Sequence, residues 1–281
     1  MSISIPKLAT GPYFYKYSTT EHLDWLKDTI LNHSVYFPTL GQLNDPADAK
    51  PRLKPVSPDE LAAHVYRDYI KGHPGMSVAE RRHHRTRLHC MVYSRYDAWL
   101  RKFAEKLYVH LNHSHRAYCL SKHYDNLVMW AKYAGNHSGY CLEFDKEYAP
   151  FNIACDVTYV SELPFMDVTD SEDRGPYAFI KHIRWSGEEE VRVGSLIFDD
   201  PKVSFKPACL KRIILGPRMS EDDEKAVRAW AEQRAPKLEV VRAYFDALDL
   251  KMKLQLPNSG PDLMDWLRYF NHLPASSVLL K

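Results

Sequence analysis

The chain has 281 residues, of which 45% are hydrophobic and 26% are charged, and its net charge is +2. These values are typical of a folded globular protein, and they exclude one that holds nucleic acid or membrane by bulk charge alone. No apolar run approaches the ~18 to 20 residues of a membrane span, and five cysteines without a CxxC pair favour reduced thiols. We therefore expect a cytoplasmic protein without a membrane partner.

The first 50 residues predict two strands, a helix and a polar turn. Residues 13–17 alternate, which suits a strand, and residues 18–21 resemble a helix cap. The predicted helix ends near residue 32, with Leu23, Trp25, Leu26 and Ile30 on its apolar side. A short strand at 35–37 follows. Asn44 and Asp45 then precede Pro46 in a predicted turn, where they serve either as turn caps or as site residues.

Residues 57–116 predict an inserted helical layer. Two helical stretches fill it, and the second contains the basic run RRHHRTRLH at 81–89. Such a run is either a solvated helix face or a contact for nucleic acid or phosphate.

The segment 119–145 organises the core of the chain. It predicts a strand, a short helix with Met129 and Trp130, a turn at 136–139, and a buried strand through Cys141 and Phe144. Glycine in the turn permits a positive φ that returns the chain to the sheet. Polar residues therefore gather at strand ends, where sites are usually built.

The remaining segments predict strands at 155–160, 191–198, 210–215, 238–243 and 248–256, with helices at 177–182, 220–233 and 261–280. We predict one α+β domain over residues 1–281. It has a mixed, mostly antiparallel sheet, the helical insertion at 57–116 and a C-terminal helix within 261–281.

Several of these motifs together resemble the family DUF2971, a domain of unknown function. The matching residues in the central segment are Asn126, Met129, Trp130, Tyr133, His137, Gly139, Glu143, Phe144 and Asp145. Further matches are 15–17, 36–37, 43–46 with Asp48, Val157 with Tyr159, and Lys181 with Trp185, Glu188, Glu190 and Arg192. The resemblance covers most of residues 13–216. It departs from the family at Ala47 and along 50–116.

Glu188, Glu190 and Arg192 are spaced by two residues, so a continuous strand would project all three from one face. Val191 and Val193 would then face the core, leaving the charged groups toward a cleft or solvent. An exposed ladder of ion pairs, which contributes little to stability, is the structural explanation for this pattern.

The functional explanation is similarity to ADP-ribosyltransferases, which place a Glu-x-Glu strand against the nicotinamide ribose of NAD. This similarity implies Glu190 as the catalytic carboxylate, with Glu188 and Arg192 assisting it. It also implies Tyr15, Lys16 and Tyr17 as nucleotide contacts and Tyr36, Phe37 and Trp130 around the nicotinamide. Asn44, Asp45 and His137 complete the candidate binding residues. NAD is the expected cofactor, and no metal is expected. A nucleic acid or protein would accept the ADP-ribose, and the resemblance favours a toxin or phage-defence effector.

Two other functions and a homodimer stay open at this stage. In a metal-dependent nuclease, Mg²⁺ would be held by Asp45, Asp48, Glu143, Asp145 and Glu188, with Lys181 and Arg192 on phosphate. In a nucleotide-sensing or interaction module, the cleft would bind without catalysing a reaction.

Overall fold

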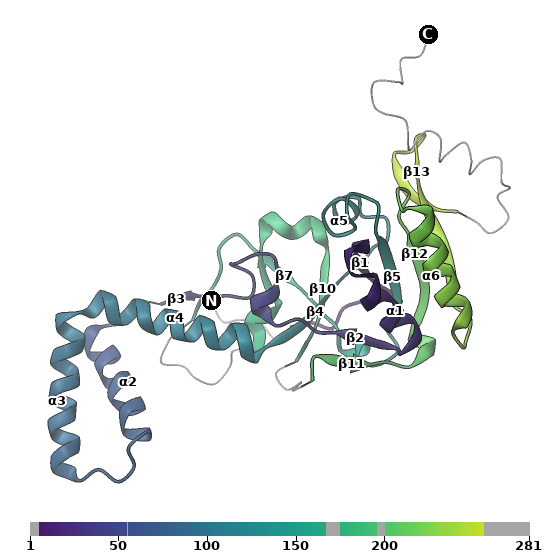
Figure 1. The fold of residues 1–281 in the computed structure, drawn as a ribbon. Coiled ribbons are helices and arrows are strands. Elements are labelled where there is room, and N and C mark those ends of the chain that lie inside the picture. The colour runs from purple at the N-terminus through teal and green to yellow at the C-terminus, as the bar shows by residue number, and fades with distance from the viewer. Residues whose placement is uncertain (1–5, 55, 167–174, 196–199, 256–281) are drawn as a thin grey trace.

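An eight-stranded sheet forms the centre of the computed structural model, which describes residues 6–54, 56–166, 175–195 and 200–255 (Figure 1). The strand order is β14-β13-β12-β5-β1-β4-β10-β6. Only the β12–β13 pair in this sheet is parallel. The strands are β1 (Tyr13–Ser18), β4 (Arg116–Ser121), β5 (Tyr140–Asp145), β6 (Cys155–Asp156), β10 (Glu190–Ser195), β12 (Leu210–Leu215), β13 (Glu239–Asp246) and β14 (Lys251–Leu254). The fold class is thus α+β with a mixed, mostly antiparallel sheet, as predicted.

Helices cover both faces of this sheet. The α-helices are α1 (Leu23–Leu31), α2 (Pro58–Lys71), α3 (Val78–Ser94), α4 (Tyr96–Ser114), α5 (Leu127–Tyr133) and α6 (Glu221–Gln233). Phe14 of β1 packs into a core with Leu26 of α1 and Val227 of α6. Tyr15 and Tyr17 join α5 in a second core, because successive side chains of a strand point to opposite faces. Within the described ranges, no helix combines the length and apolar character needed to cross a bilayer.

The turn between α5 and β5 depends on close backbone packing. Asn126 caps α5, because its side-chain oxygen accepts hydrogen bonds from the backbone of Val128 and Met129. After the helix, a Cβ added to Gly139 would lie 2.1 Å from the Ser18 carbonyl oxygen of β1. Glycine is therefore required here by the approach of two backbones.

Residues 57–114 form a projecting helical segment, the helical arm. Ser57 and Ser77 begin α2 and α3, each in a capping box with a glutamate three residues later. Leu61 of α2 and Val92 of α3 are buried in a small core of the arm. The insertion is helical as predicted, but α2 and α3 project away from the sheet instead of layering over it (Figure 1).

Short elements complete the fold. Three two-stranded sheets pair β2 (Ser34–Tyr36) with β11 (Lys202–Ser204), β3 (Arg52–Leu53) with β8 (Phe165–Met166), and β7 (Thr158–Val160) with β9 (Ile180–His182). The 3-10 helices are η1 (Thr20–His22), η2 (Leu40–Gln42), η3 (Phe151–Ile153), η4 (Gly175–Phe179), η5 (Ile183–Glu188) and η6 (Pro207–Cys209).

Several local predictions are wrong for identifiable reasons. The predicted helix at 177–182 is the end of η4 followed by β9, because pairing with β7 overrides local propensity. At the predicted cap, residues 18–21, no side chain forms a capping hydrogen bond, and the helix begins as η1. Trp25 is 59% exposed instead of buried, where it stacks on His22. The predicted helix at 261–280 lies outside the described residues.

Candidate functional site

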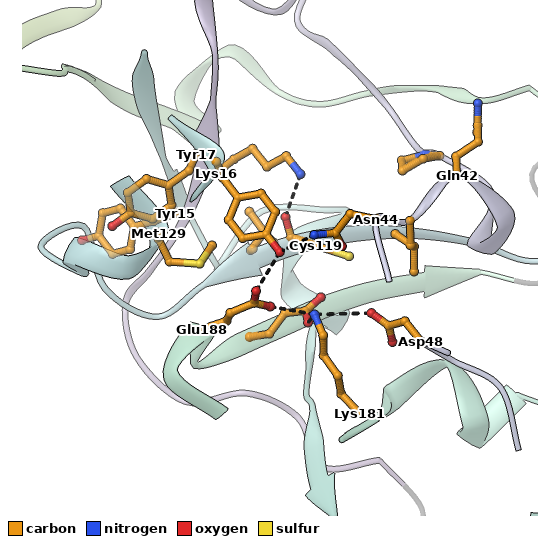
Figure 2. A pocket seen from close by; sticks show the side chains of 15 residues that line it. Tyr15, Lys16, Tyr17, Gln42, Asn44, Asp48, Cys119, Met129, Lys181 and Glu188 are labelled. Carbon is orange, nitrogen blue, oxygen red and sulfur yellow. Dashed lines mark hydrogen bonds and ion pairs between the residues drawn. The ribbon is translucent and has the colours of Figure 1, made fainter. Parts of the chain in front are cut away.

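A pocket of about 240 Å³ opens beside β1 and β4, between α5 and the turn that contains Asn44 and Asp48 (Figure 2). The side chains on its lining come from distant parts of the chain: Tyr15, Lys16, Tyr17, Gln42, Asn44, Asp48, Cys119, Met129, Tyr133, Lys181, Glu188 and Glu190. Ligand pockets usually enclose ~300 to 1,000 Å³, so this one has room for one end of a nucleotide.

One wall of the pocket is aromatic and held rigidly. Tyr17 donates its hydroxyl proton to the His123 carbonyl oxygen (2.6 Å) and meets Trp130 edge to face (centroids 5.2 Å apart). Tyr15 packs against Tyr124 (5.9 Å). Burial, with a smaller contribution from Glu143, raises the pKa of Tyr15, so this phenol stays neutral at physiological pH. The wall therefore offers flat apolar surface with no charge.

The floor of the pocket is a buried cluster of charges around Lys181 of β9. The Lys181 ammonium lies 2.6 Å from Glu188 Oε2, 2.9 Å from Glu190 Oε2 and 3.3 Å from Asp48 Oδ2. All four side chains are at most 4% exposed. Figure 2 shows the ammonium between Glu188 and Asp48. Buried carboxylates are costly unless they are paired, so the lysine is needed to hold three of them together.

Arg192 of β10 completes this cluster of charges. Its guanidinium donates from Nε to Glu190 Oε1 (2.6 Å) and from Nη2 to both Glu190 Oε2 (2.9 Å) and Asp48 Oδ2 (2.7 Å). Nη1 donates to the Ala178 carbonyl oxygen (2.7 Å). The fixed fork of an arginine suits such a bidentate contact with a carboxylate. Glu190 is thereby occupied on both oxygens.

The shifts in pKa follow from this arrangement. Burial alone would raise the pKa of Glu190, but Arg192 and then Lys181 lower it to about 2. For Lys181, burial favours the neutral amine, whereas Glu190 and Asp48 raise its pKa above the ordinary value. Glu190 and Lys181 are therefore charged at neutral pH. Three buried carboxylates surround two buried cations, and the third cation that contacts them, Lys132, is 39% exposed.

Glu188 has two further hydrogen-bond partners, one of which is partly exposed. Its Oε1 accepts hydrogen bonds from the Tyr133 hydroxyl (2.7 Å) and from Lys132 Nζ (3.2 Å). Lys132 is 39% exposed, and its ammonium lies over the Trp185 ring. The Asn44 amide donates to the Tyr133 hydroxyl (2.9 Å). A ligand hydroxyl at the pocket wall could take the place of Tyr133 or Lys132 on this carboxylate.

A sharp turn of the backbone places the two glutamates together. Glu188 ends η5, and Glu189 takes a left-handed φ of 45° before β10 begins at Glu190. The turn is fastened by Ser121 Oγ, which donates to the Glu188 carbonyl oxygen (3.0 Å), and by Asn126 Nδ2, which donates to Gly187 (2.7 Å). The prediction that Glu188 lies on the same strand as Glu190 is therefore wrong, although the two carboxylates converge.

The charged face of β10 is also buried instead of facing a cleft or solvent. Glu190 is 4% exposed and Arg192 is 0% exposed. The exposed ladder of ion pairs considered from the sequence is thus excluded. Burial makes these charges depend strongly on one another, since removal of one leaves another uncompensated.

Comparison with known proteins gives one match. The family model described as "Protein of unknown function (DUF2971)" matches residues 129–193. A search of the curated proteins and a search of the solved structures each found no match.

The DUF2971 match covers one part of the pocket. It runs from α5 through β10, and so it includes Tyr133, Lys181, Glu188 and Glu190. β1 and the turn at Asp48, which supply the facing walls, lie before it. The resemblance over most of residues 13–216 is therefore supported for 129–193, and ADP-ribosyltransferase similarity has no support from these comparisons.

Six of the proposed site residues line the pocket, and Arg192 lies in the charged cluster beside it. The six are Tyr15, Lys16, Tyr17, Asn44, Glu188 and Glu190. Lys16 Nζ donates to the Cys119 carbonyl oxygen (3.1 Å) and lies 4.9 Å from the centroid of the Tyr118 ring. Lysine has three donors, so this ammonium keeps donors for a ligand.

Three proposed aromatic contacts lie away from the pocket lining. Tyr36 stacks near Trp25 (centroids 6.0 Å apart) and donates its hydroxyl proton to Gln42 Oε1 (3.2 Å). Phe37 is fully buried against Tyr118 (5.2 Å). Trp130 is fully buried behind Tyr17 and donates to the Tyr124 carbonyl oxygen (2.7 Å).

Asp45 and His137 form hydrogen bonds that hold turns of the backbone. Asp45 Oδ1 accepts from the Ala47 backbone (2.9 Å), the turn role considered above. His137 has a φ of 70°, and its carbonyl oxygen accepts from the Arg218 backbone (3.0 Å). Burial, followed by the charge of Arg218, lowers the pKa of His137. Neither residue lines the pocket.

The transferase scheme missed the groups that organise the floor. Lys181 and Asp48 appeared as family matches and as phosphate and metal contacts of the nuclease alternative, and Tyr133 appeared only as a family match. Their common signal is charge balance, because three clustered carboxylates require cations once they are buried. Sequence spacing shows neither the burial nor the meeting of segments more than a hundred residues apart.

The five acidic residues proposed to hold Mg²⁺ are not gathered at one point. Glu143 lies 3.6 Å from Arg212, and Asp145 lies 3.2 Å from Lys211, on the side of β1 away from β10. Among the described residues, no group of three His, Cys, Asp or Glu side chains has metal-binding geometry. Between Asp48 and Glu188, the position that a cation would take is filled by the Lys181 ammonium.

Proposed function

We propose that the pocket binds the nicotinamide ribose end of NAD and cleaves its N-glycosidic bond, as an ADP-ribosyltransferase-like enzyme. The observation that carries the proposal is the set of three buried carboxylates, Asp48, Glu188 and Glu190, which Lys181 and Arg192 hold together at the pocket floor. Cleavage of a glycosidic bond develops positive charge on the sugar, and fixed negative charge next to it lowers the barrier.

The pocket walls suit the other parts of this substrate. Tyr15 and Tyr17 offer a flat apolar surface to the nicotinamide ring, and Met129 borders the same core. Lys16 keeps free donors for the adjoining phosphate. The volume of about 240 Å³ matches one end of the dinucleotide, so the adenosine half would lie outside.

The roles of the two glutamates differ from the first assignment. Glu190 is held on both oxygens by Arg192 and Lys181, so it anchors the cluster. Glu188 would face the ribose and accept its hydroxyl hydrogen bond in place of Tyr133. In the reaction, the C1′–N bond breaks and its electron pair leaves with nicotinamide. An acceptor oxygen then bonds to C1′ and releases its proton to solvent.

The proposal is tested by release of nicotinamide from NAD, followed by chromatography with and without EDTA. The Glu188→Gln variant keeps the size of the side chain and removes its charge. We expect a loss of roughly 100-fold, the scale of losing one electrostatic group at a reacting centre. Glu189→Gln is the matched control, because Glu189 is the adjacent residue but its side chain is 50% exposed. It should stay within about twofold of the wild type.

Four outcomes would contradict the proposal. The wild type could release no nicotinamide and show no NAD-dependent rise in melting temperature. Glu188→Gln could stay fully active, which would remove the assigned role. Activity that disappears in EDTA would instead favour metal-assisted chemistry. Binding of NAD without cleavage by any variant would favour the nucleotide-sensing module.

A further inference from the structure

A second hollow lies on the helical arm, apart from the pocket beside β1 and β4. It is a groove of about 450 Å³ where the end of α3 meets the beginning of α4. Its lining residues are Met91, Ser94, Arg95, Ala98, Trp99 and Lys102. This part of the arm projects from the sheet (Figure 1).

The groove lies on a basic part of the chain. Residues 57–114 contain ten Lys and Arg residues against six Asp and Glu residues, whereas the net charge of the whole chain is only +2. Arg82, Arg85 and Arg87 of α3 are exposed, as are Arg95 and Lys102 in the groove. Within the described residues, none of these five cations forms an ion pair with a carboxylate. They are therefore available to an anionic partner.

The groove also contains an aromatic ring beside a cation. Trp99 packs its inner side against the core of the arm, and Lys102 Nζ lies 5.9 Å from its ring centroid. Met91, which is 42% exposed, also lines the groove. A purely electrostatic surface needs neither Trp99 nor Met91. Together they offer apolar contact for a planar group next to charges that attract phosphate.

We propose that this groove binds single-stranded nucleic acid, with one unstacked base on Trp99 and the neighbouring phosphates on Arg95 and Lys102. Proteins that hold single strands combine a basic track with aromatic side chains on which bases stack. The volume of about 450 Å³ accommodates a base with its sugar. In a duplex the bases are already stacked, so only the phosphate contacts would remain. This inference does not depend on the NAD proposal.

The test uses fluorescence anisotropy of a labelled oligo(dT) of ~12 nucleotides, a length within the usual site size for such proteins. The full chain should bind it, and the affinity should fall as salt rises, because bound phosphates release counterions. The double variant Arg95→Gln with Lys102→Gln should bind at least ~10-fold more weakly. Its matched control is Lys225→Gln with Lys251→Gln, which removes two exposed lysines outside the arm and should leave binding within about twofold.

Several results would overturn the proposal. These are no binding at low salt, equal affinity of the groove variant and the wild type, and equal affinity for the corresponding duplex. Equal affinity for polyglutamate would reduce the effect to general attraction of polyanions. Melting temperatures of both variants should match the wild type, since all four side chains are exposed. Nicotinamide release should also be unchanged in the groove variant.

Discussion

Replacing Arg192 with methionine tests whether charge compensation holds the pocket floor together. The arginine is fully buried and donates to Glu190, Asp48 and the Ala178 carbonyl oxygen. Methionine fills much of the same space but leaves Lys181 as the one buried cation for three carboxylates. Breaking a buried ion pair by removing one partner costs ~3 to 5 kcal/mol, because the remaining charge stays buried and unpaired.

Urea unfolding at pH 7.5, followed by circular dichroism, measures this cost as a lower midpoint at an unchanged slope. Lys225→Met is the matched control, since Lys225 is 73% exposed and lies 3.7 Å from Asp222, which is 98% exposed. An exposed pair contributes at most ~1 kcal/mol, so this control should remain close to the wild type. Adding Glu190→Gln to Arg192→Met should restore part of the loss, because one uncompensated charge is removed.

A small effect would refute this reasoning. If Arg192→Met unfolds within ~1 kcal/mol of the wild type, the cluster is either hydrated or able to rearrange around the missing guanidinium. If Glu190→Gln adds its own loss to that of Arg192→Met instead of offsetting it, the two side chains act independently. Either result would also weaken the proposal that the floor presents fixed negative charge to a substrate.

Two further predictions concern pH and backbone packing. The pKa of Glu190 is lowered from 4.5 to about 2, so the stabilisation from its charge is present above pH 4.5 and is lost as pH falls toward 2. Unfolding free energies at pH 7, 5 and 3 should therefore show Glu190→Gln approaching the wild type on acidification, and a constant difference would contradict this. Gly139→Ala should lower the melting temperature severely, because its Cβ would meet the Ser18 backbone at 2.1 Å, whereas Gly75→Ala meets nothing within 4 Å. Similar melting temperatures for the two variants would show that β1 and the turn can move apart.

Local patterns explain why much of the fold was predictable. Alternation marked β1, and apolar runs marked β5 and β12. The capping boxes at Ser57 and Ser77, which begin α2 and α3, are local as well. These signals act within a few residues and do not need the rest of the chain. The prediction failed where tertiary pairing decided, as at β9, whose parallel partner β7 is separated from it by the segment 161–179.

The site was predictable in part, for a related reason. Residue type and spacing identified Glu188 and Glu190, and alternation placed Tyr15 and Tyr17 on one face of β1. Residue type could not show that Phe37 and Trp130 are core residues, because an aromatic side chain suits a core and a pocket equally.

The sequence by itself determined most of the segments that are strands or helices, and it determined that carboxylates and aromatics occur near strand ends. Only the tertiary structure decided that Asp48, Lys181 and Arg192 meet in one buried cluster. The physical reason is that hydrogen bonds of the backbone and alternation of side chains are local, whereas burial is a property of the whole packed chain. Burial turns three ordinary carboxylates into groups that must be compensated, and their partners come from wherever the fold brings cations.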